Sequence, residues 1–413
     1  MNILLLSILV VVALCWITII SFGDWKRVQG LMYDSHTPPD IFDHPANQLP
    51  PTVTWPLNRP YITVIVPGRN EGHVLGETLG SICRQDYPNF RVVFVDDQST
   101  DKTAEIARRL ATQFPHLKII HNTQPPPPGW MGKNWAIHQA GEWTDSEYLL
   151  FVDSDMHFHP QCLQQAVRLV LHRNLDLLSI LPRPQGQSLM EQGFLMVALT
   201  AMFTLAAPHR SNDSTSKVVL TAGAFLFFRR QAYEAIGGHE AIKGQLIEDL
   251  ALGGRAKSRG FRVFTVVTRE LLFGRMYEGV ADTFRGGKKN VYAGLKYNPL
   301  AALVLALGFL FVGALLPIYP VVAASLVLIT LAPGAWANLA LAVSVNALAL
   351  VHMRRVRRFL GGRPGAELTL AVAVTFCLAI LMASVWDYYT GGNVWSGRTY
   401  NRKDMAHPDE AIR

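Results

Sequence analysis

Asp153 and Asp155 stand two positions apart, directly after the apolar run at residues 148–152. Carboxylates with this spacing at the end of a buried strand can share one hard cation and leave coordination positions open for phosphate oxygens. An isolated Asp-x-Asp is also compatible with a turn that its aspartates cap. The preceding apolar run, and a second acidic pair at Asp96 and Asp97, favour a bound Mg²⁺ or Mn²⁺.

Polar side chains also accompany two earlier apolar runs. Pro67, Arg69, Asn70 and Glu71 end or follow the run at residues 61–67, and Asp96 and Asp97 follow the run at residues 91–95. At such strand ends an acidic side chain can accept hydrogen bonds from a base or a ribose. Either carboxylate could do this; we assign the contact to Asp97 and helix capping to Asp96.

Glu248 and Asp249 open a helix that the sequence predicts over Leu250–Arg259. The helix dipole keeps a carboxylate at this position ionised, and ordinary helix capping would use the same residues. The earlier segment Thr221–Phe228 predicts a small-residue turn and an apolar strand, as in the wall of an acceptor pocket. This neighbourhood favours a functional role for the acidic pair.

Lys133 follows Gly132 and the proline-rich loop at residues 125–128. Glycine lets the backbone approach a phosphate and lysine supplies a point charge, so the pair predicts a phosphate contact; a plain surface loop is the alternative. The chain contains no Gly-x-Gly-x-x-Gly and no Walker loop, which argues against a dinucleotide-dependent oxidoreductase and an ATPase.

Two alternating kinds of element must position these side chains. Short apolar runs predict strands at residues 61–67, 91–97, 117–121, 148–155 and 175–181, and helices are predicted at 74–84 and 102–112, the latter capped by Ser99 or Thr100. Strands that alternate with helices form parallel sheets with helices on both faces. The predicted domain at residues 61–295 is therefore α/β, with its polar residues at the carboxyl ends of the strands.

The composition indicates a membrane protein with an ordered domain. Half of the 413 residues are apolar, 17% are charged, and the mean hydropathy is +0.18. These values exclude a disordered chain, and four cysteines without paired spacing exclude a disulfide scaffold or a zinc ribbon. We assign the net charge of +7 to an anionic membrane face or a phosphate-bearing substrate, and expect no nucleic-acid partner.

The first 23 residues carry no charge, and no small-residue cleavage site follows them. Lys26 and Arg27 come after the apolar run, whereas a cleaved signal peptide carries its positive charge before it. We therefore expect an uncleaved transmembrane anchor at residues 1–23 with its C-terminal side in the cytoplasm, and a Pro- and Asn-rich linker at residues 24–60.

A second uncharged region, residues 297–353, is long enough for two transmembrane helices, with a break near Pro317–Pro320. The arginine-rich loop at residues 354–367 marks a cytoplasmic side under the positive-inside rule. Residues 368–386 predict a further transmembrane helix before the tail at residues 387–413.

Two features of this layout stay open. Four spans would put the tail outside, whereas Arg398, Arg402 and Lys403 favour the cytoplasm. The apolar segment at residues 191–207 predicts an interfacial helix through which a hydrophobic acceptor could approach the site. A buried core helix and a membrane-crossing helix are the alternatives.

Taken in order, the polar motifs resemble those of glycosyltransferase family 2 over residues 60–290. They are Pro67-x-Arg69-Asn70-Glu71, Asp96-Asp97-x-Ser99, Gly132-Lys133-Asn134, Asp153-x-Asp155 and Glu248-Asp249. The resemblance implies a GT-A fold and an inverting transfer from a nucleotide-diphosphate sugar, usually a UDP-sugar. It also implies that Pro67, Arg69, Asn70 and Glu71 belong to the donor-binding site and that Asp97 contacts the base. By the same resemblance, Asp155 ligates the metal beside Asp153. Glu248 and Asp249 are then the catalytic pair, with Asp249 as the general base.

The membrane layout resembles the lipid-glycosylating branch of this family, which includes ceramide glucosyltransferase and hopanoid- and carotenoid-glycosylating enzymes. The tail at Trp395–Tyr400 is similar to that of the last two. This implies an inner-membrane enzyme, with a cytoplasmic catalytic domain, that moves a hexose to a lipid hydroxyl or carboxyl. Alternatives are a polyprenyl phosphate acceptor, a polysaccharide synthase-like enzyme, or a transporter or scaffold with an inactive transferase domain.

One motif of the family is missing. Its processive polysaccharide synthases carry Gln-x-x-Arg-Trp after the Glu-Asp pair, whereas this chain has Arg275 and the segment Arg285–Asn290 there. Arg275 or the lysines of this segment would stabilise the departing UDP. The missing motif and the small number of spans argue against a polymer-extruding channel.

Overall fold

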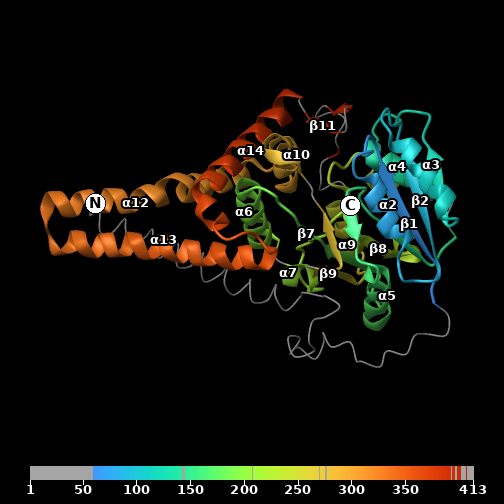
Figure 1. Ribbon diagram of the computed structural model, residues 1–413, viewed down its shortest axis with the longest axis horizontal. Coiled ribbons are helices and arrows are strands. Elements are labelled where there is room, and N and C mark those ends of the chain that lie inside the picture. Colours follow the sequence, from blue (N-terminus) through green and yellow to red (C-terminus); the bar gives the residue numbers. More distant parts are fainter. Residues whose placement is uncertain are drawn as a thin grey trace. The chain divides into compact units, whose positions relative to one another are not determined.

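The computed structural model describes residues 59–141, 145–206, 208–268, 270–274, 277–391, 393–395, 398–400 and 406. The described residues fall into two compact units (Figure 1). Those within 59–184, 206–276 and 388–406 form the sheet unit, and those within 185–205 and 277–387 form the helical unit. The anchor predicted at residues 1–23, nearly all of the predicted linker, and Arg275 lie outside the described residues.

A seven-stranded sheet with the order β3-β2-β1-β4-β8-β6-β9 forms the centre of the sheet unit. Its strands are β1 (Ile62–Gly68), β2 (Phe90–Asp96), β3 (Leu117–His121), β4 (Tyr148–Phe151), β6 (Leu177–Leu181), β8 (Leu226–Arg229) and β9 (Val263–Val267). A second, three-stranded sheet contains β5 (Met156–Phe158), β10 (Leu272–Gly274) and β7 (Arg183–Pro184).

The expectation of a parallel sheet is right for β1 to β4 and wrong at β8. Neighbouring strands from β1 to β4 are parallel, as are β6 and β9, but β8 is antiparallel to both β4 and β6. Residues 221–225 reach β8 from the edge of the sheet where β4 ends. The strand that follows must therefore run in the opposite direction to β4.

Helices cover both faces of this sheet, as the sequence predicts. The helices α2 (Leu75–Cys83), α3 (Thr103–Gln113) and α5 (Cys162–Arg173) pack on one face, and α4 (Gly132–Gly141), α8 (Arg230–Ala235) and α9 (Glu248–Ser258) pack on the other. In β1, Val64 and Val66 join the first core and Ile65 joins the second. Side chains of a strand alternate between faces, so one fully apolar strand supplies both cores.

The start of α3 differs from the sequence-based expectation. The helix begins at Thr103, whose N–H donates to the Asp101 carboxylate at 3.0 Å. Ser99 and Thr100 lie too far before this turn to cap it. They are instead bonded to Asn70: Ser99 Oγ accepts from the Asn70 N–H at 3.0 Å, and the Thr100 N–H donates to Asn70 Oδ1 at 2.8 Å.

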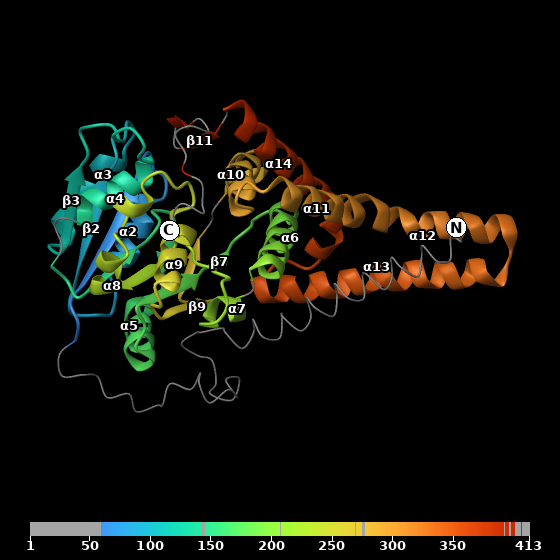
Figure 2. The ribbon, with the colours of Figure 1, turned by 180° about the vertical axis from the view of Figure 1, so that it is seen from behind.

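Long apolar helices make up most of the helical unit (Figure 2). They are α6 (Leu189–Leu205), α11 (Pro299–Leu310), α12 (Leu316–Thr330), α13 (Pro333–Leu360) and α14 (Leu370–Thr390), and α10 (Gly279–Gly294) is a more polar helix. Within the described residues, four helical stretches are long and apolar enough to cross a membrane: Leu189–Asn212, Pro299–Thr330, Pro333–Leu360 and Ala366–Thr390.

The break predicted near Pro317–Pro320 is not there. Helix runs without interruption from Pro299 to Thr330, and the chain turns at Leu331, which has a left-handed φ of 51°. A π-helical turn at Phe311–Leu315 stands just before Pro317 and opens the backbone ladder where a proline ring would clash. Proline is instead used at Pro333 to start α13, because its missing N–H costs nothing at that position.

Candidate active site

The predicted site residues come together at one edge of the seven-stranded sheet. Arg69, Asn70 and Glu71 follow β1, Asp97 follows β2, and Asp153 and Asp155 follow β4. Lys133 lies in the first turn of α4, and Glu248 and Asp249 form the first turn of α9. All belong to the sheet unit. The carboxyl ends of parallel strands meet at one edge, which explains how residues so distant in sequence become neighbours.

Lys133 links two of these elements. Its ammonium group donates to Asp153 Oδ1 at 2.5 Å and forms an ion pair with Glu248 Oε1. Burial opposes the charge on Lys133, but the neighbouring Asp153 and Glu248 outweigh it and raise the lysine pKa. The ammonium group therefore stays charged at neutral pH, and it fixes the turn after β4 against the start of α9.

Gly223 provides the space for this arrangement, a role that the sequence alone does not reveal. A Cβ at this position would lie 2.9 Å from Lys133 Nζ, 3.0 Å from Glu248 Oε1 and 3.4 Å from Asp153 Oδ2. Only a residue without a side chain leaves these three groups in place. The sequence shows a run of small residues at 222–224, but this run does not indicate which side chains pack against Gly223.

Asp249 is buried and held by backbone donors. Its Oδ2 accepts from the Gly223 N–H at 2.7 Å and its Oδ1 from the Leu250 N–H at 2.7 Å. Burial, followed by the neighbouring Glu248 carboxylate, raises the pKa of Asp249 to about 7. A carboxyl with such a pKa can take up and release a proton near neutral pH, which suits a general base.

Asp155 has the environment of a cation ligand. Burial, then the nearby Asp153 and Glu71 carboxylates, raise its pKa to about 7. Its Oδ1 is buried and has no hydrogen-bond partner within the described residues. A divalent cation would supply the missing partner and the missing positive charge, so Asp153 and Asp155 fit a metal. The described residues contain no cluster of three or more His, Cys, Asp or Glu side chains, so such a cation would need further oxygens from a ligand.

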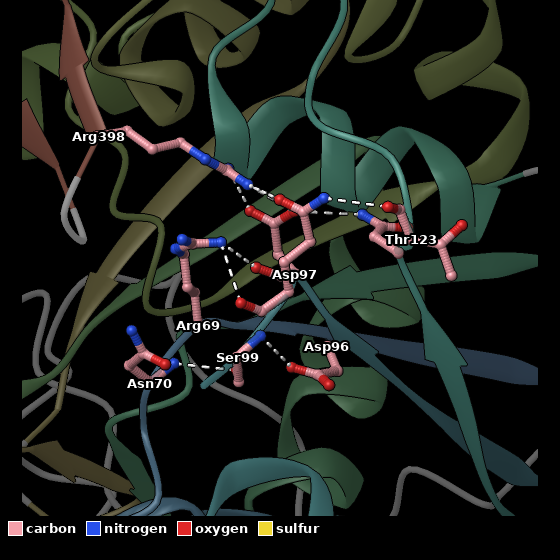
Figure 3. A network of polar contacts seen from close by, with 9 residues as sticks. Arg69, Asn70, Asp96, Asp97, Ser99, Thr123 and Arg398 are labelled. Atoms are coloured by element: carbon pink, nitrogen blue, oxygen red, sulfur yellow. Dashed lines mark hydrogen bonds and ion pairs between the residues drawn. The ribbon is translucent and has the colours of Figure 1, made fainter. Parts of the chain in front are cut away.

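Asp97 is bound by the side chain of Arg398, a residue 301 positions away (Figure 3). Arg398 Nη1 donates to Asp97 Oδ2 at 2.5 Å, and Nη2 donates to Gln98 Oε1 at 2.8 Å. Arg69 donates to the main-chain oxygens of the same two residues, at 2.7 Å and 3.2 Å. In the sequence, Arg398 stands out by its charge and by its place in the tail segment Trp395–Tyr400, but nothing local shows which residue it contacts.

Asn134 fastens a loop beside the lysine. Its Nδ2 donates to the main-chain oxygens of Ile242, Lys243 and Gln245 at 3.0–3.1 Å. The Met131 N–H donates to the Lys243 oxygen at 2.7 Å. The loop between α8 and α9 is thus fixed to the start of α4, which places the acidic pair of α9 opposite Lys133.

The remaining predicted residues have less specific surroundings. Pro67 is buried within β1, two positions before Arg69. Glu71 accepts a side-chain hydrogen bond from Ser154, and burial is the largest cause that raises its pKa. Roles in donor binding for both residues stay predictions.

Comparison of the sequence with protein-family models shows which family has this domain. Residues 63–237 match the model of the family described as Glycosyl transferase family 2. The chain carries a glycosyl transferase family 2 domain. The matched segment runs from the second residue of β1 to beyond β8 and contains all predicted site residues except Glu248, Asp249 and Arg275.

Curated relatives of this family 2 domain include two from Staphylococcus aureus, both described as 4,4'-diaponeurosporenoate glycosyltransferase. The protein of strain N315 is 27% identical over 255 residues, which cover 59% of this chain and 64% of the relative. That of strain MRSA252 is 27% identical over 264 residues, covering 61% and 67%. The chain thus spans just under two thirds of the length of the first.

Among solved structures, the mannosyltransferase PcManGT from Pyrobaculum calidifontis, in complex with GDP-Man and Mn²⁺, has a similar fold. The TM-score is 0.53 with 20% sequence identity, over 96% of this chain and 100% of that chain. This likeness and the family match confirm the predicted α/β GT-A fold.

Proposed function

We propose that this chain is a membrane-bound glycosyltransferase that moves a hexose from a UDP-sugar to a hydroxyl or carboxyl group of a membrane lipid, with inversion at the anomeric carbon. One observation carries this function: a buried carboxyl with a pKa near 7, Asp249, lies in the same site as the paired aspartates Asp153 and Asp155. Inverting transfer needs a base on one side of the sugar and support for the leaving diphosphate on the other.

Each residue has a distinct part in this proposal. Asp249 takes the proton from the acceptor hydroxyl, and its backbone donors at Gly223 and Leu250 fix the carboxylate. Lys133 holds Glu248 and Asp153 in place on either side of Gly223. Asp97 binds the base of the donor, at the end of β2.

The same residues suit a divalent cation. Asp155, with Asp153 beside it, would hold Mg²⁺ or Mn²⁺ together with oxygens of the donor diphosphate. Bound there, the cation supplies positive charge to the departing UDP. The similar structure of PcManGT contains Mn²⁺ and GDP-Man, which supports a divalent cation in this chain without specifying the ion.

A lipid acceptor is supported by the S. aureus relatives, whose name describes glycosylation of 4,4'-diaponeurosporenoate. It is further supported by the four apolar helices. A carotenoid-like or hopanoid-like acceptor is therefore our first choice. Polyprenyl phosphate is the second choice, because its anionic head would have to approach the acidic pair Glu248 and Asp249.

Chain connectivity supports a specific membrane topology. β6 precedes α6 and pairs with β8, which follows it, so both ends of α6 connect to one sheet. A single helix between two such points cannot cross a membrane. We therefore propose that α6 lies at the membrane interface and does not cross the membrane.

The same reasoning applies to the C-terminal helices. β9 lies before them in the chain and Arg398 after them, and both belong to the sheet unit, so an even number of helices crosses. α12 and α13 pack together, and basic residues stand at both outer ends of the pair: Lys288, Lys289 and Lys296 before α11, and Arg354, Arg355, Arg357 and Arg358 at the end of α13. The positive-inside rule places both ends in the cytoplasm.

α14 then starts and ends on the cytoplasmic side. Before it, Glu367 pairs with Arg357 at 2.9 Å; near its end, Asp387 pairs with Lys288 at 2.7 Å. Lys288 comes before α11 and Arg357 lies at the end of α13, so both belong to the basic ends that we place in the cytoplasm. In place of the crossing expected at residues 368–386, we propose an interfacial helix with Trp386 and Tyr389 exposed to lipid headgroups.

The activity is tested with membranes from cells that express the chain, given radiolabelled UDP-glucose and Mg²⁺. Label extracted into organic solvent is expected with the intact chain and with Glu240→Gln, a control at an exposed carboxylate, and not with Asp249→Asn. Equal labelling with Asp249→Asn and with the intact chain would refute the assignment of Asp249 as the general base. No labelling with any UDP-hexose, in the presence of added carotenoid and hopanoid acceptors, would refute the function.

A further inference from the structure

The ion pair between Arg398 and Asp97 joins the C-terminal tail to the end of β2 in the sheet unit. The Asp97 side chain is 1% exposed and that of Arg398 is 16% exposed, so both charges are largely removed from water. Arg398 is carried by a short antiparallel hairpin, β11 (Asn393–Trp395) with β12 (Arg398–Tyr400). A second tail contact lies at Ala406, whose N–H donates to the Gly244 oxygen at 2.9 Å.

Asp97 depends on this arginine. Its other side-chain contacts are longer, with Arg398 Nη2 at 3.4 Å and Asn122 Nδ2 at 3.5 Å from Oδ1. A buried carboxylate without a strong partner is costly, and an arginine pair both neutralises and orients it. Oδ1 therefore keeps capacity to accept a further hydrogen bond, while Oδ2 is held by Arg398.

Gln98 is positioned by the same guanidinium. Its backbone has a left-handed φ of 60°, and its side chain links Arg398 to the Thr123 oxygen, which it reaches at 3.3 Å. Arg69 holds the main chain of Asp97 and Gln98, and Arg398 holds their side chains (Figure 3). Arg69 and Arg398, which are far apart in the sequence, thus together hold Asp97 and Gln98 in place at the end of β2.

We propose that Arg398 is a positioning residue of the donor site: it orients Asp97 and Gln98 at the end that takes the nucleoside, so the C-terminal tail completes the site. This inference rests on the proposed function, because it assumes that a nucleotide binds beside Asp97. Arg398 acts at the nucleoside end, whereas Lys133 and Asp155 act at the diphosphate end.

The test measures binding of UDP, UMP and pyrophosphate to the full-length detergent-solubilised protein in the presence of Mg²⁺, by titration calorimetry. Loss of a hydrogen bond to a charged group weakens binding about tenfold or more. Arg398→Ala is expected to weaken the binding of UDP and of UMP by the same factor and to leave the binding of pyrophosphate unchanged. Arg398→Lys should recover part of the loss, because lysine keeps the charge but not the paired geometry.

Transfer kinetics give a second readout. Arg398→Ala should raise the KM for the UDP-sugar by a similar factor with little change in kcat, since the base and the acceptor are unaffected. Arg109→Ala, at an exposed arginine on α3, is the matched control and should change neither value. The melting temperature of each variant without added ligand identifies any that fail to fold.

The outcomes separate the two proposals. Wild-type protein that binds none of the three ligands would refute the proposed function itself. Wild-type binding that Arg398→Ala and Arg398→Lys leave unchanged would overturn only the role of Arg398. Tighter UDP binding by Arg398→Ala would also overturn it, because the tail would then exclude the donor instead of completing its site.

Discussion

Lys133 forms an ion pair with Glu248, the residue directly before the proposed base Asp249. The pair gives Glu248 a positive neighbour, so its negative charge acts less strongly on Asp249. Lys133 also lowers the pKa of Asp249 directly, against the larger effects of burial and Glu248. Burial and Glu248 raise the pKa of Asp249 and Lys133 lowers it, so the pKa of the proposed base lies near neutral pH. The pH dependence of the reaction tests this.

The rate of transfer should depend on pH through Asp249. Its folded pKa of about 7 lies above the ordinary 3.8, so the carboxylate needed to accept a proton forms only as the pH rises through 7. We expect kcat to fall about tenfold for each pH unit below that value. A pH profile of kcat between pH 5 and 9 checks this, and a flat profile down to pH 5 would contradict the assignment.

Gly223→Ala should disable the site without unfolding the protein. The new Cβ would lie 2.9 Å from Lys133 Nζ and 3.0 Å from Glu248 Oε1, so the ion pair must shift. Displacements of this size at a reacting centre cost about 10²-fold in rate. Transfer assays on Gly223→Ala and on Gly141→Ala, whose Cβ meets nothing within 4 Å, make the comparison. Similar activities in both variants would count against the site.

Asp155→Asn should stabilise the protein at pH 8. The pKa of Asp155 is raised, so the folded state binds its proton more tightly than the unfolded state, and stability falls as the pH rises from about 4 to 7. Asparagine removes this cost, which is of the order of 1 kcal/mol or more. Melting curves should show a higher Tm for the variant at pH 8 and a smaller difference at pH 5.

The same variant tests the metal site. Mn²⁺ should raise the Tm of the wild-type protein at pH 8, because a cation that binds only the folded state stabilises it. Asp155→Asn should lose this response. An equal rise in Tm for both proteins would place the cation elsewhere.

Membrane topology is checked by labelling introduced cysteines with a membrane-impermeant thiol reagent. Arg363→Cys, after α13, and Thr390→Cys, at the end of α14, should react only from the cytoplasmic side. Ala332→Cys, in the turn between α12 and α13, should react only from the opposite side. Cys83, Cys162 and Cys377 are buried, and Cys15 is replaced by Ser in every variant, so the background labelling should be low. Labelling of Thr390→Cys from outside would refute the interfacial placement of α14.

Local patterns in the sequence determined much of the site. Apolar runs of strand length set β1 to β4, and each polar motif stands where such a run ends, as at Asp153 or Arg69. The strand ends of a parallel sheet share one edge, so the motifs could be placed in one site before any contact was known. The reversal at β8 could not be predicted in this way, because strand direction depends on which edge the chain approaches from.

Tertiary structure alone decided which distant residues meet. Lys133 was a candidate for a phosphate contact, and only the fold shows it between Asp153 and Glu248, with Gly223 giving the space. The sequence marks Arg398 as a basic residue of the tail segment Trp395–Tyr400, and only the fold pairs it with Asp97. Apolar periodicity is a local property that a sequence displays directly. The partner of a charged side chain is set by chain segments that fold back from hundreds of residues away.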